Sequence, residues 1–256
     1  MSASTAPKSA IPERRRSERY RRVILKVSGE SLAAPGQLGI DAEELRTIAN
    51  EIAQARESFE DLQMAVVVGG GNIVRGAKLA EEGRINQSTA DYMGMLGTVI
   101  NGLALREAME QLGVQSRVMS ALTVTAVAEP FIRLRALRHM EKGRVVILVA
   151  GTGNPFFTTD TCASLRAIEL NAEILLKATK VDGIYSADPR TDRSAVRYDQ
   201  LTFRDAIDRR LRVMDLTALA MCMEHKLPVC VFDFKTTGNI RRVIGGDPIG
   251  TLVSGS

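Results

Sequence analysis

The stretch "VVILVAGTGNPFFTTDTCASLRAIEL" (residues 145–170) contains the three kinds of local structure that decide the fold. Its first five residues are apolar and predict a buried strand, and a Gly-Thr-Gly-Asn-Pro turn begins at Gly151. Two phenylalanines, two threonines and Asp160 follow, and a helical pattern begins at about residue 161. A strand, a glycine turn and a helix in this order are typical of α/β proteins with parallel sheets.

The same order recurs along the chain. Apolar runs predict five further buried strands, at residues 22–28, 64–68, 116–121, 172–179 and 228–234. Helical spacing and end signals predict helices at residues 42–59, 89–112, 130–142, 161–170, 206–210, 215–225 and 239–244. Nearly continuous apolar strands between helices indicate a mostly parallel sheet with both faces covered. We therefore predict one α/β domain at residues 21–256 after a tail at residues 1–20.

Two helix ends carry specific signals. Asp41 stands just before the first helix and Glu44 follows three residues later, which is the pattern of a capping box. Gly143 follows the third predicted helix and is the residue type favoured just after a helix end.

The net charge of +4 is confined to the N-terminus. Residues 1–22 hold seven basic and two acidic side chains, which leaves 27 basic and 28 acidic side chains in the rest of the chain. We interpret residues 1–20 as a solvated, disordered basic tail rather than a nucleic-acid-binding element, because its composition cannot build a core.

Other bulk features narrow the class of protein. No run of 18 apolar residues is present and the N-terminus has no apolar signal region, so we expect neither a membrane span nor secretion. The three cysteines, Cys162, Cys222 and Cys230, show no C-x-x-C spacing, which argues against a disulfide framework or a zinc site. A reducing cytoplasm is the expected location.

Segments that contain glycine and polar residues follow four of the predicted strands. They are Ser28-Gly29, Gly69–Asn72, Gly151–Asn154 and Thr179–Asp182. The carboxyl ends of parallel strands share one edge of a sheet, and glycine turns let backbone N–H groups approach an anion there. Together the turns predict a phosphate-binding edge, although neither a P-loop nor a G-x-G-x-x-G fingerprint occurs.

Two cations accompany these turns. Lys26 stands in an otherwise apolar strand, either as an edge residue whose ammonium reaches water or as a charge delivered to phosphate oxygens. Arg75 follows the triple glycine, either as a solvent-exposed arginine or as a phosphate-binding guanidinium.

Six motifs carry a resemblance to a known family. They are "KVSGE" (26–30), "VVVGGGNIVRG" (66–76), "DYMGMLGTVINGLALR" (91–106), "GTGNPFFTTD" (151–160), "LKATKVDGIYSADP" (176–189) and "VMDLTALAMCMEHKLPVCVF" (213–232). Residues 20–253 resemble the bacterial uridylate kinases (UMP kinases) of the amino acid kinase superfamily. The resemblance implies a three-layer domain whose mostly parallel sheet has about eight strands, with helices on both faces.

The resemblance also implies a reaction and its residues. The reaction is in-line transfer of the γ-phosphoryl group of ATP to UMP, with Mg²⁺ accompanying ATP and no direct protein ligand assigned to the metal. The implied catalytic residues are Lys26, Arg75 and Asp160. The implied ATP-binding residues are Lys26, Val27, Ser28, Gly29, Gly71, Arg75, Thr179, Tyr185 and Asp188. The implied UMP-binding residues are Gly70, Asp91, Thr152, Gly153, Asn154, Pro155, Phe156, Phe157, Thr158 and Thr159.

Some of these residues also have purely structural interpretations. Asp91 and Asp160 could each be a helix N-cap, and one of Phe156 and Phe157 could be a buried hydrophobic plug. Under the resemblance, Asp160 either lies near Mg²⁺ or holds Lys26. Asp188 precedes a proline and could serve turn geometry alone.

The resemblance further implies a homohexamer, for which the helix at residues 89–112 is a candidate interface, and regulation by GTP activation and UTP inhibition. Arg106 and Arg144 match effector positions. The segment "AAPGQLG" (33–39) departs from the glycine-rich pattern of GTP-activated members and includes Pro35.

Two alternatives to a UMP kinase stay open at this point. An amino-acid or carbamate kinase would keep the fold and change the acceptor. A nucleotide-sensing regulator would bind the same ligands without catalysis.

Overall fold

The computed structural model describes residues 19–255, except residues 82, 84, 190, 193, 212 and 213. All but two residues of the predicted N-terminal tail lie outside the described residues. The strands are β1 (Arg22–Val27), β2 (Gln63–Val68), β3 (Ser116–Ser120), β4 (Glu129–Pro130), β5 (Val145–Val149), β6 (Ile174–Thr179), β7 (Ile184–Tyr185), β8 (Arg197–Tyr198), β9 (Gln200–Leu201), β10 (Val229–Asp233) and β11 (Thr251–Val253). The helices are α1 (Ala42–Ser58), α2 (Gly76–Glu81), α3 (Gln87–Gln111), α4 (Arg133–Glu141), α5 (Thr159–Glu169), α6 (Phe203–Asp208), α7 (Leu216–Glu224) and α8 (Asn239–Ile244), with a 3₁₀ turn η1 (Gly29–Leu32).

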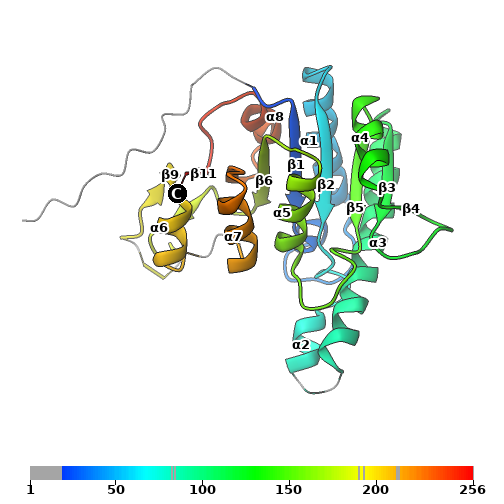
Figure 1. The fold of residues 1–256 in the computed structure, drawn as a ribbon, viewed down its shortest axis with the longest axis horizontal. Helices are drawn as coiled ribbons and strands as arrows, with labels where there is room; N and C mark the ends of the chain where they lie inside the picture. Colours follow the sequence, from blue (N-terminus) through cyan, green and yellow to red (C-terminus); the bar gives the residue numbers. More distant parts are fainter. Residues whose placement is uncertain are drawn as a thin grey trace, which may run out of the picture.

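Within the described residues, nine strands form one sheet in the order β4-β3-β5-β2-β1-β6-β10-β11-β9 (Figure 1). Only β10 and β11 pair antiparallel, and the other neighbours are parallel. Strands β7 and β8 form a separate hairpin. The central strand β1 therefore lies between β2 and β6, and its carboxyl end is flanked by theirs.

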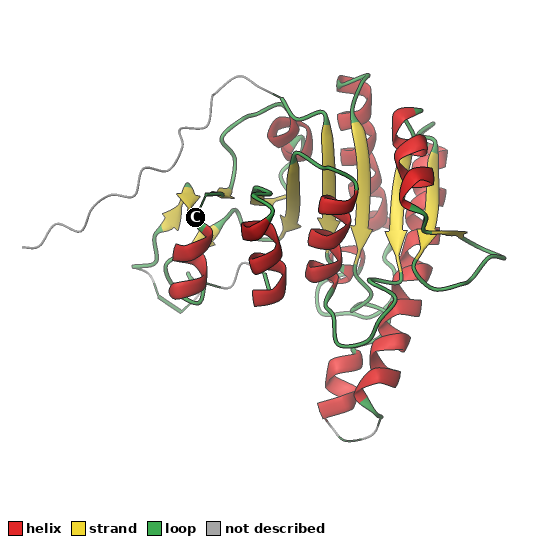
Figure 2. Ribbon diagram, viewed as in Figure 1, coloured by secondary structure: helices red, strands yellow, loops and turns green. Residues whose placement is uncertain are grey.

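Helices cover both faces of the sheet (Figure 2). One buried cluster contains residues of α1, α3 and α8, and a second contains residues of α4, α5, α6 and α7. Alternation along β1 places Leu25 in the first cluster and Ile24 in the second, as expected for a strand buried on both faces. Helix α2 and the start of α3 extend beyond the carboxyl edge of the sheet (Figure 1).

The predicted three-layer, mostly parallel architecture is confirmed, including all six predicted strands. The short strands β4, β9 and β11 lacked a sequence signal because two or three residues are too few to show a period. The predicted helix at residues 130–142 was wrong at its start: Pro130 pairs in β4 with Ser120, and α4 begins at Arg133.

The two predicted helix ends had different outcomes. Gly143 has φ 73°, which confirms it as the residue after α4. Asp41 caps α1 by accepting from the backbone N–H groups of Glu43 and Glu44, both at 3.0 Å. The reciprocal half of the capping box was wrong, because the Asp41 N–H donates to the carbonyl of Leu32 and the Glu44 carboxylate pairs with Lys235.

The contact between α3 and β5 gives a stability prediction. A Cβ added at Gly102 would lie 2.4 Å from Cγ1 of Val149 in the buried layer, whereas one added at Gly94 meets nothing within 4 Å. We expect Gly102→Ala to lower the free energy of unfolding by about 1–3 kcal/mol, because overpacking outweighs the gain in helix propensity. Gly94→Ala is the control, and should raise it by up to about 1 kcal/mol. Denaturant unfolding of both variants tests this, and a stabilised Gly102→Ala would contradict it.

Candidate active site

Two lysines stand side by side on the central strands. The parallel register of β1 and β6 pairs Lys26 with Lys177. Alternation puts both on the face of the sheet that α5 covers, since Ile24 and Leu175, two residues earlier in each strand, lie in that cluster. Adjacent like charges on one face are unfavourable unless an anion lies between them.

Asp160 of α5 supplies that anion. The Nζ of Lys26 lies 2.9 Å from Oδ1 of Asp160, and the Nζ of Lys177 donates to Oδ2 at 2.7 Å. The side chains of Lys26, Asp160 and Lys177 are only 9%, 15% and 16% exposed. We call these three residues the lysine–aspartate cluster.

The protonation equilibria in this cluster reflect burial and charge together. Burial acts to raise the pKa of Asp160, but the ammonium groups of Lys26 and Lys177 outweigh it, so the pKa lies below its usual value. Burial lowers the pKa of Lys177, and Lys26 lowers it further, against the attraction of Asp160. The two ammonium groups of the cluster suit an anionic ligand.

The Asp160 side chain is not needed to cap α5, because another residue is the N-cap. The hydroxyl oxygen of Thr158 caps the helix by accepting from the N–H groups of Asp160 and Thr161, both at 3.1 Å. The interpretation of Asp160 as an N-cap was therefore wrong. Of its two expected alternatives, the geometry supports the one in which Asp160 holds Lys26.

Glycines let two strand ends touch beside this cluster. A Cβ on Gly69, after β2, would lie 2.6 Å from the backbone nitrogen of Gly29, after β1. A Cβ on Gly70 would lie 2.4 Å from the carbonyl oxygen of Gly94 in α3. Gly71 has nothing within 4 Å of such a Cβ, so its side faces open space. Gly69 and Gly70 leave no room for a side chain, because other backbone segments pack directly against them.

A pair of buried side-chain amides holds the glycine turn after β2. Asn72 and Asn101 are fully buried, and the Nδ2 of Asn101 donates to the carbonyl of Gly69 and to Oδ1 of Asn72 at 2.8 and 2.7 Å. The Nδ2 of Asn72 donates to the carbonyl of Gly39 at 2.8 Å. Helix α3 and the loop before α1 thus hold the glycine turn in one conformation.

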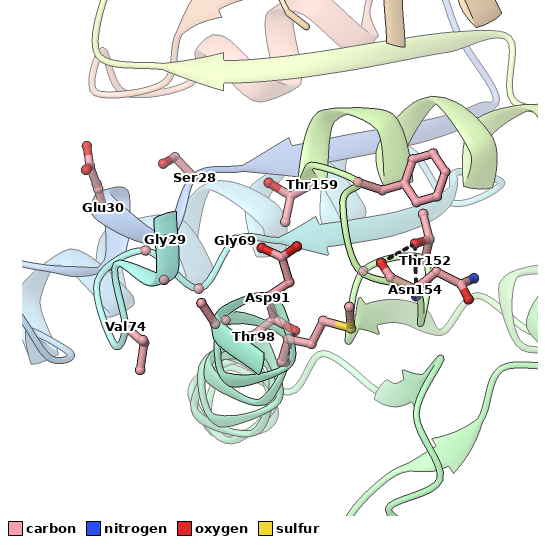
Figure 3. Close-up of a pocket in the computed structure, with 18 residues that line it drawn as sticks. Ser28, Gly29, Glu30, Gly69, Val74, Asp91, Thr98, Thr152, Asn154 and Thr159 are labelled. Carbon is pink, nitrogen blue, oxygen red and sulfur yellow. Dashed lines mark hydrogen bonds between the residues drawn. The ribbon is translucent and has the colours of Figure 1, made fainter. Parts of the chain in front are cut away.

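A cavity of about 280 Å³ opens between these turns, α3 and the loop after β5 (Figure 3). From the predicted ATP set it brings together Ser28, Gly29 and Gly71. From the predicted UMP set it brings together Gly70, Asp91, Thr152, Asn154, Phe157 and Thr159. The other predicted residues do not line this cavity, although Lys26 and Asp160 lie within the adjoining lysine–aspartate cluster.

Asp91 connects two walls of the cavity. It lies within α3, where Asn86 is the N-cap, so the interpretation of Asp91 as an N-cap was wrong. Its carboxylate accepts from the N–H of Phe156 at 2.7 Å and from Nε2 of Gln87 at 2.8 Å. Phe156, with φ 70°, is 74% exposed. Phe157 is also exposed, so neither phenylalanine is a buried plug.

Arg75 lies at the mouth of the site. Its NH2 group is 3.5 Å from Oε1 of Glu30, which lines the 280 Å³ cavity, and both side chains are largely exposed. Arg75 itself lines a neighbouring cavity of about 530 Å³, together with apolar residues that include Leu38 and Met93. In this conformation the guanidinium points to a carboxylate at the entrance.

The residues predicted for the adenine end lie past β6. The Thr179 hydroxyl donates to the carbonyl of Val181 at 2.7 Å, and the Tyr185 hydroxyl donates to Oδ1 of Asp182 at 2.7 Å. The carbonyl of Asp188 accepts from the N–H groups of Thr191 and Asp192, which is turn geometry. Thr179 is the last residue of β6, and its carbonyl accepts from the N–H of Phe234, which follows β10.

The two predicted effector arginines differ in their surroundings, and Arg144 does not line the cavity that Arg106 lines. Arg106 lines a cavity of about 420 Å³ with Arg117, Glu110 and Glu129 among others. Arg144 is instead 3.1 Å from Nδ1 of His139, whose Nε2 is 3.2 Å from Glu129. His139 thus has partners on both ring nitrogens.

Sequence reasoning missed Lys177. A signal was present, because "ILLKAT" in β6 and "ILKVS" in β1 each place one lysine in an apolar run near the end of the strand. Lys177 stands two residues before the end of β6, and Lys26 stands one residue before the end of β1. What the pattern lacked was the register that places the two lysines next to each other.

The described residues contain neither a membrane-spanning helix nor a cluster of metal ligands. No helix among them is long and apolar enough to cross a membrane. In the same part of the chain, no three His, Cys, Asp or Glu side chains gather as metal ligands. The three cysteines are buried, and no disulfide joins any of them in this part of the chain.

The lysine–aspartate cluster gives a second stability prediction. Asp160→Asn removes the carboxylate that both buried ammonium groups contact, and we expect it to lower the free energy of unfolding at pH 7 by about 3–5 kcal/mol. Because the folded-state pKa of Asp160 is lowered, the stabilisation is complete above its unfolded value of about 3.9 and is lost as the pH falls through the folded value. Denaturant unfolding between pH 2 and 7 measures the difference. Asp61→Asn, at an exposed ion pair with Arg19, is the control and should cost at most about 1 kcal/mol. A difference between wild type and Asp160→Asn that does not shrink below pH 4 would contradict the assignment.

Comparison with known proteins identifies the family of the chain. The Amino acid kinase family profile matches residues 21–233. The crystal structure of UMP kinase from Bacillus anthracis aligns with a TM-score of 0.88 and 39% identity, over 93% of this chain and 97% of that one. UMP kinase from Ureaplasma parvum gives 0.85 and 36%, over 93% and 100%. Uridylate kinase from Archaeoglobus fulgidus gives 0.68 and 29%, over 91% and 99%. The chain belongs to the amino acid kinase family.

Proposed function

We propose that this protein transfers the γ-phosphoryl group of ATP to UMP, which yields ADP and UDP. The observation that carries the proposal is the buried lysine–aspartate cluster, whose two ammonium groups lie beside a glycine-lined cavity at the carboxyl edge of the sheet. The likeness to three uridylate kinases over more than nine-tenths of the chain favours a nucleotide acceptor over an amino acid or carbamate.

The cluster explains how a phosphoryl group could be transferred without a covalent enzyme intermediate. A phosphate oxygen of UMP attacks the γ-phosphorus in line with the leaving oxygen of ADP, and negative charge is spread over the transferring group. Lys26 and Lys177 neutralise this charge, while Asp160 keeps the two ammonium groups fixed before the substrates arrive. Backbone N–H groups of the turns after β1 and β2 add further donors.

Arg75 completes this arrangement. Its ion pair with Glu30 is exposed and therefore weak, so a phosphate can replace the carboxylate as its partner. Mg²⁺ enters as part of the MgATP substrate, bound mainly by phosphate oxygens and water. The protein's own task is to hold and orient the two nucleotides.

The acceptor occupies the wall formed by α3 and the loop after β5. The Asp91 carboxylate has acceptor capacity for the two ribose hydroxyls of UMP, and Thr152, Asn154 and Thr159 offer polar groups to the base and phosphate. Gly153, Pro155, Phe156, Phe157 and Thr158 shape the same loop. The donor nucleotide occupies the ends of β1 and β6, with Val27 beside its phosphates and Thr179, Tyr185 and Asp188 on its adenosine side.

The decisive test is ADP release from MgATP with UMP, dUMP, CMP, AMP, carbamate, aspartate or N-acetylglutamate as acceptor. We expect strong preference for UMP, and a fall in kcat of about 10² or more for Lys177→Met, because a donor to the transition state is lost. Lys142→Met, at the opposite edge of the sheet, is the matched control and should keep full activity. Turnover with a small acid instead of UMP would reject the acceptor assignment. ATP binding without turnover of any acceptor would favour a nucleotide-sensing regulator.

We also propose a homohexamer in which α3 contributes a contact. Leu96 and Ile100 lie four residues apart on α3, and each is 48% exposed. Tyr92 continues the same stripe one turn earlier. A stripe of large apolar side chains along one helix is typical of a surface that another chain covers.

The oligomer proposal predicts the effect of a charge in this stripe. Leu96→Asp should reduce the particle mass of the protein, because a carboxylate cannot be buried against a second apolar surface. Leu134→Asp on α4, where the leucine is even more exposed, is the control and should leave the mass unchanged. Sedimentation velocity measures both. An unchanged mass for Leu96→Asp would place the contact elsewhere.

Regulation and location complete the proposal. GTP activation would use Arg106 and Arg144, and UTP would inhibit by product-like competition with UMP. Three buried cysteines that form no disulfide in the described part of the chain suit a reducing cytoplasm. No role with nucleic acid is proposed, since the chain after residue 22 has no excess of basic side chains.

A further inference from the structure

Asp215 stands immediately before α7 and was not among the predicted site residues. We propose that Asp215 is a positioning residue for phosphoryl transfer, which holds the start of α5 so that Asp160 meets the two lysines. The inference rests on the proposed function for its kinetic consequences, but its geometry is independent of the substrate.

The Asp215 carboxylate joins two helices that lie side by side (Figure 1). Its Oδ2 accepts the hydroxyl hydrogen of Thr158 at 2.5 Å, and its Oδ1 accepts that of Thr161 at 2.9 Å. Its Oδ1 also accepts from the N–H of Ala218 at 3.0 Å, which caps α7. One carboxylate thus serves the N-terminal turns of both α5 and α7.

The contact with Thr158 reaches Asp160 directly. A threonine hydroxyl has one hydrogen and two acceptor lone pairs. Because the hydrogen points to Asp215, the lone pairs of Thr158 face the N–H groups of Asp160 and Thr161. The hydroxyl of Thr161 is a more distant acceptor for Thr158, at 3.5 Å. Asp215 therefore sets the orientation of the cap that fixes the backbone of Asp160.

Asp215 also acts on Lys177 through its charge. Four charged groups from different elements gather here: Lys177 from β6, Lys26 from β1, Asp160 from α5 and Asp215 from the start of α7. Burial lowers the pKa of Lys177 and Lys26 adds to this, whereas Asp160 and Asp215 oppose it. Asp215 thus helps to keep Lys177 protonated.

A purely structural role as the cap of α7 makes different predictions. Asn and Asp are about equally good N-caps, so the amide oxygen in Asp215→Asn can keep a cap for α7. The substitution removes the charge and replaces the oxygen that accepts from Thr158 by an N–H donor. The matched control is Asp205→Asn in α6, where Thr202 donates its hydroxyl hydrogen to the carboxylate at 2.8 Å. That pair repeats the threonine–carboxylate chemistry of a helix cap away from the lysines.

The kinetic test compares these variants with UMP and MgATP. We expect Asp215→Asn to lower kcat about tenfold, with much smaller changes in KM, and to move the alkaline limb of the kcat pH profile to lower pH. Asp205→Asn should change neither. Thr158→Val should lower kcat similarly and add little in the double variant. Thr158→Ser keeps a hydroxyl and should restore most of the kcat that Thr158→Val loses. If Asp215→Asn does not fold, the two Thr158 variants decide the question.

A second measurement does not need activity. Titration of lysine side-chain resonances by NMR, with Lys177→Arg for assignment, should give a lower Lys177 pKa in Asp215→Asn than in the wild type or Asp205→Asn. An unchanged Lys177 pKa together with an unchanged kcat profile would overturn the inference. If the wild type does not phosphorylate UMP, the proposed function fails, and the titration alone supports or overturns the effect of Asp215 on Lys177.

Discussion

Two lysines next to each other on parallel strands are the constraint on which the rest of this structure depends. The register of β1 and β6 brings Lys26 and Lys177 together on a buried face, and only a carboxylate between them makes this arrangement stable. Asp160 lies in the first turn of α5, so this end of the helix has to pack close to β1 and β6. The sharp turn after β5, with positive φ at Ala150, Gly151, Gly153 and Phe156, meets that requirement.

A second constraint is the approach of backbone to backbone at the carboxyl edge. Gly29 and Gly69 come so close that no side chain fits between the ends of β1 and β2. The buried amides of Asn72 and Asn101 then satisfy polar groups that this tight arrangement hides from water. The lysine ammonium groups and the backbone N–H groups of the glycine turns are consequently fixed around one cavity. This is the arrangement that binding of a polyanion needs.

Local features could be read from the sequence, whereas features set by distant partners could not. Apolar runs located β1, β2 and β5, and Gly143 marked the end of α4, because each depends on neighbouring residues. Pro130 was assigned to a helix because its pairing with Ser120 in an edge strand leaves no periodic signal. The Glu44–Lys235 pair joins residues 191 positions apart, so no local pattern announces it.

The candidate site shows the same division. The sequence predicted the glycine turns, Lys26 and Asp160 as site residues, because glycine and charged residues stand out near the ends of apolar strands. Lys177 and Asp215 were not, since their importance comes from register and from the packing of α5 on α7. Sequence resemblance located Asp91, but only the fold revealed that its carboxylate holds the loop after β5.

The walls of the cavity come from separate parts of the chain. The charges lie on β1, β6 and α5, while the wall proposed for the acceptor comes from α3 and the loop after β5. Substitutions in α3 can therefore reshape the acceptor wall while leaving the charged cluster intact. Such a division makes the scaffold evolvable: drift in one helix can recruit a new acceptor, and the phosphoryl-transfer apparatus is inherited unchanged.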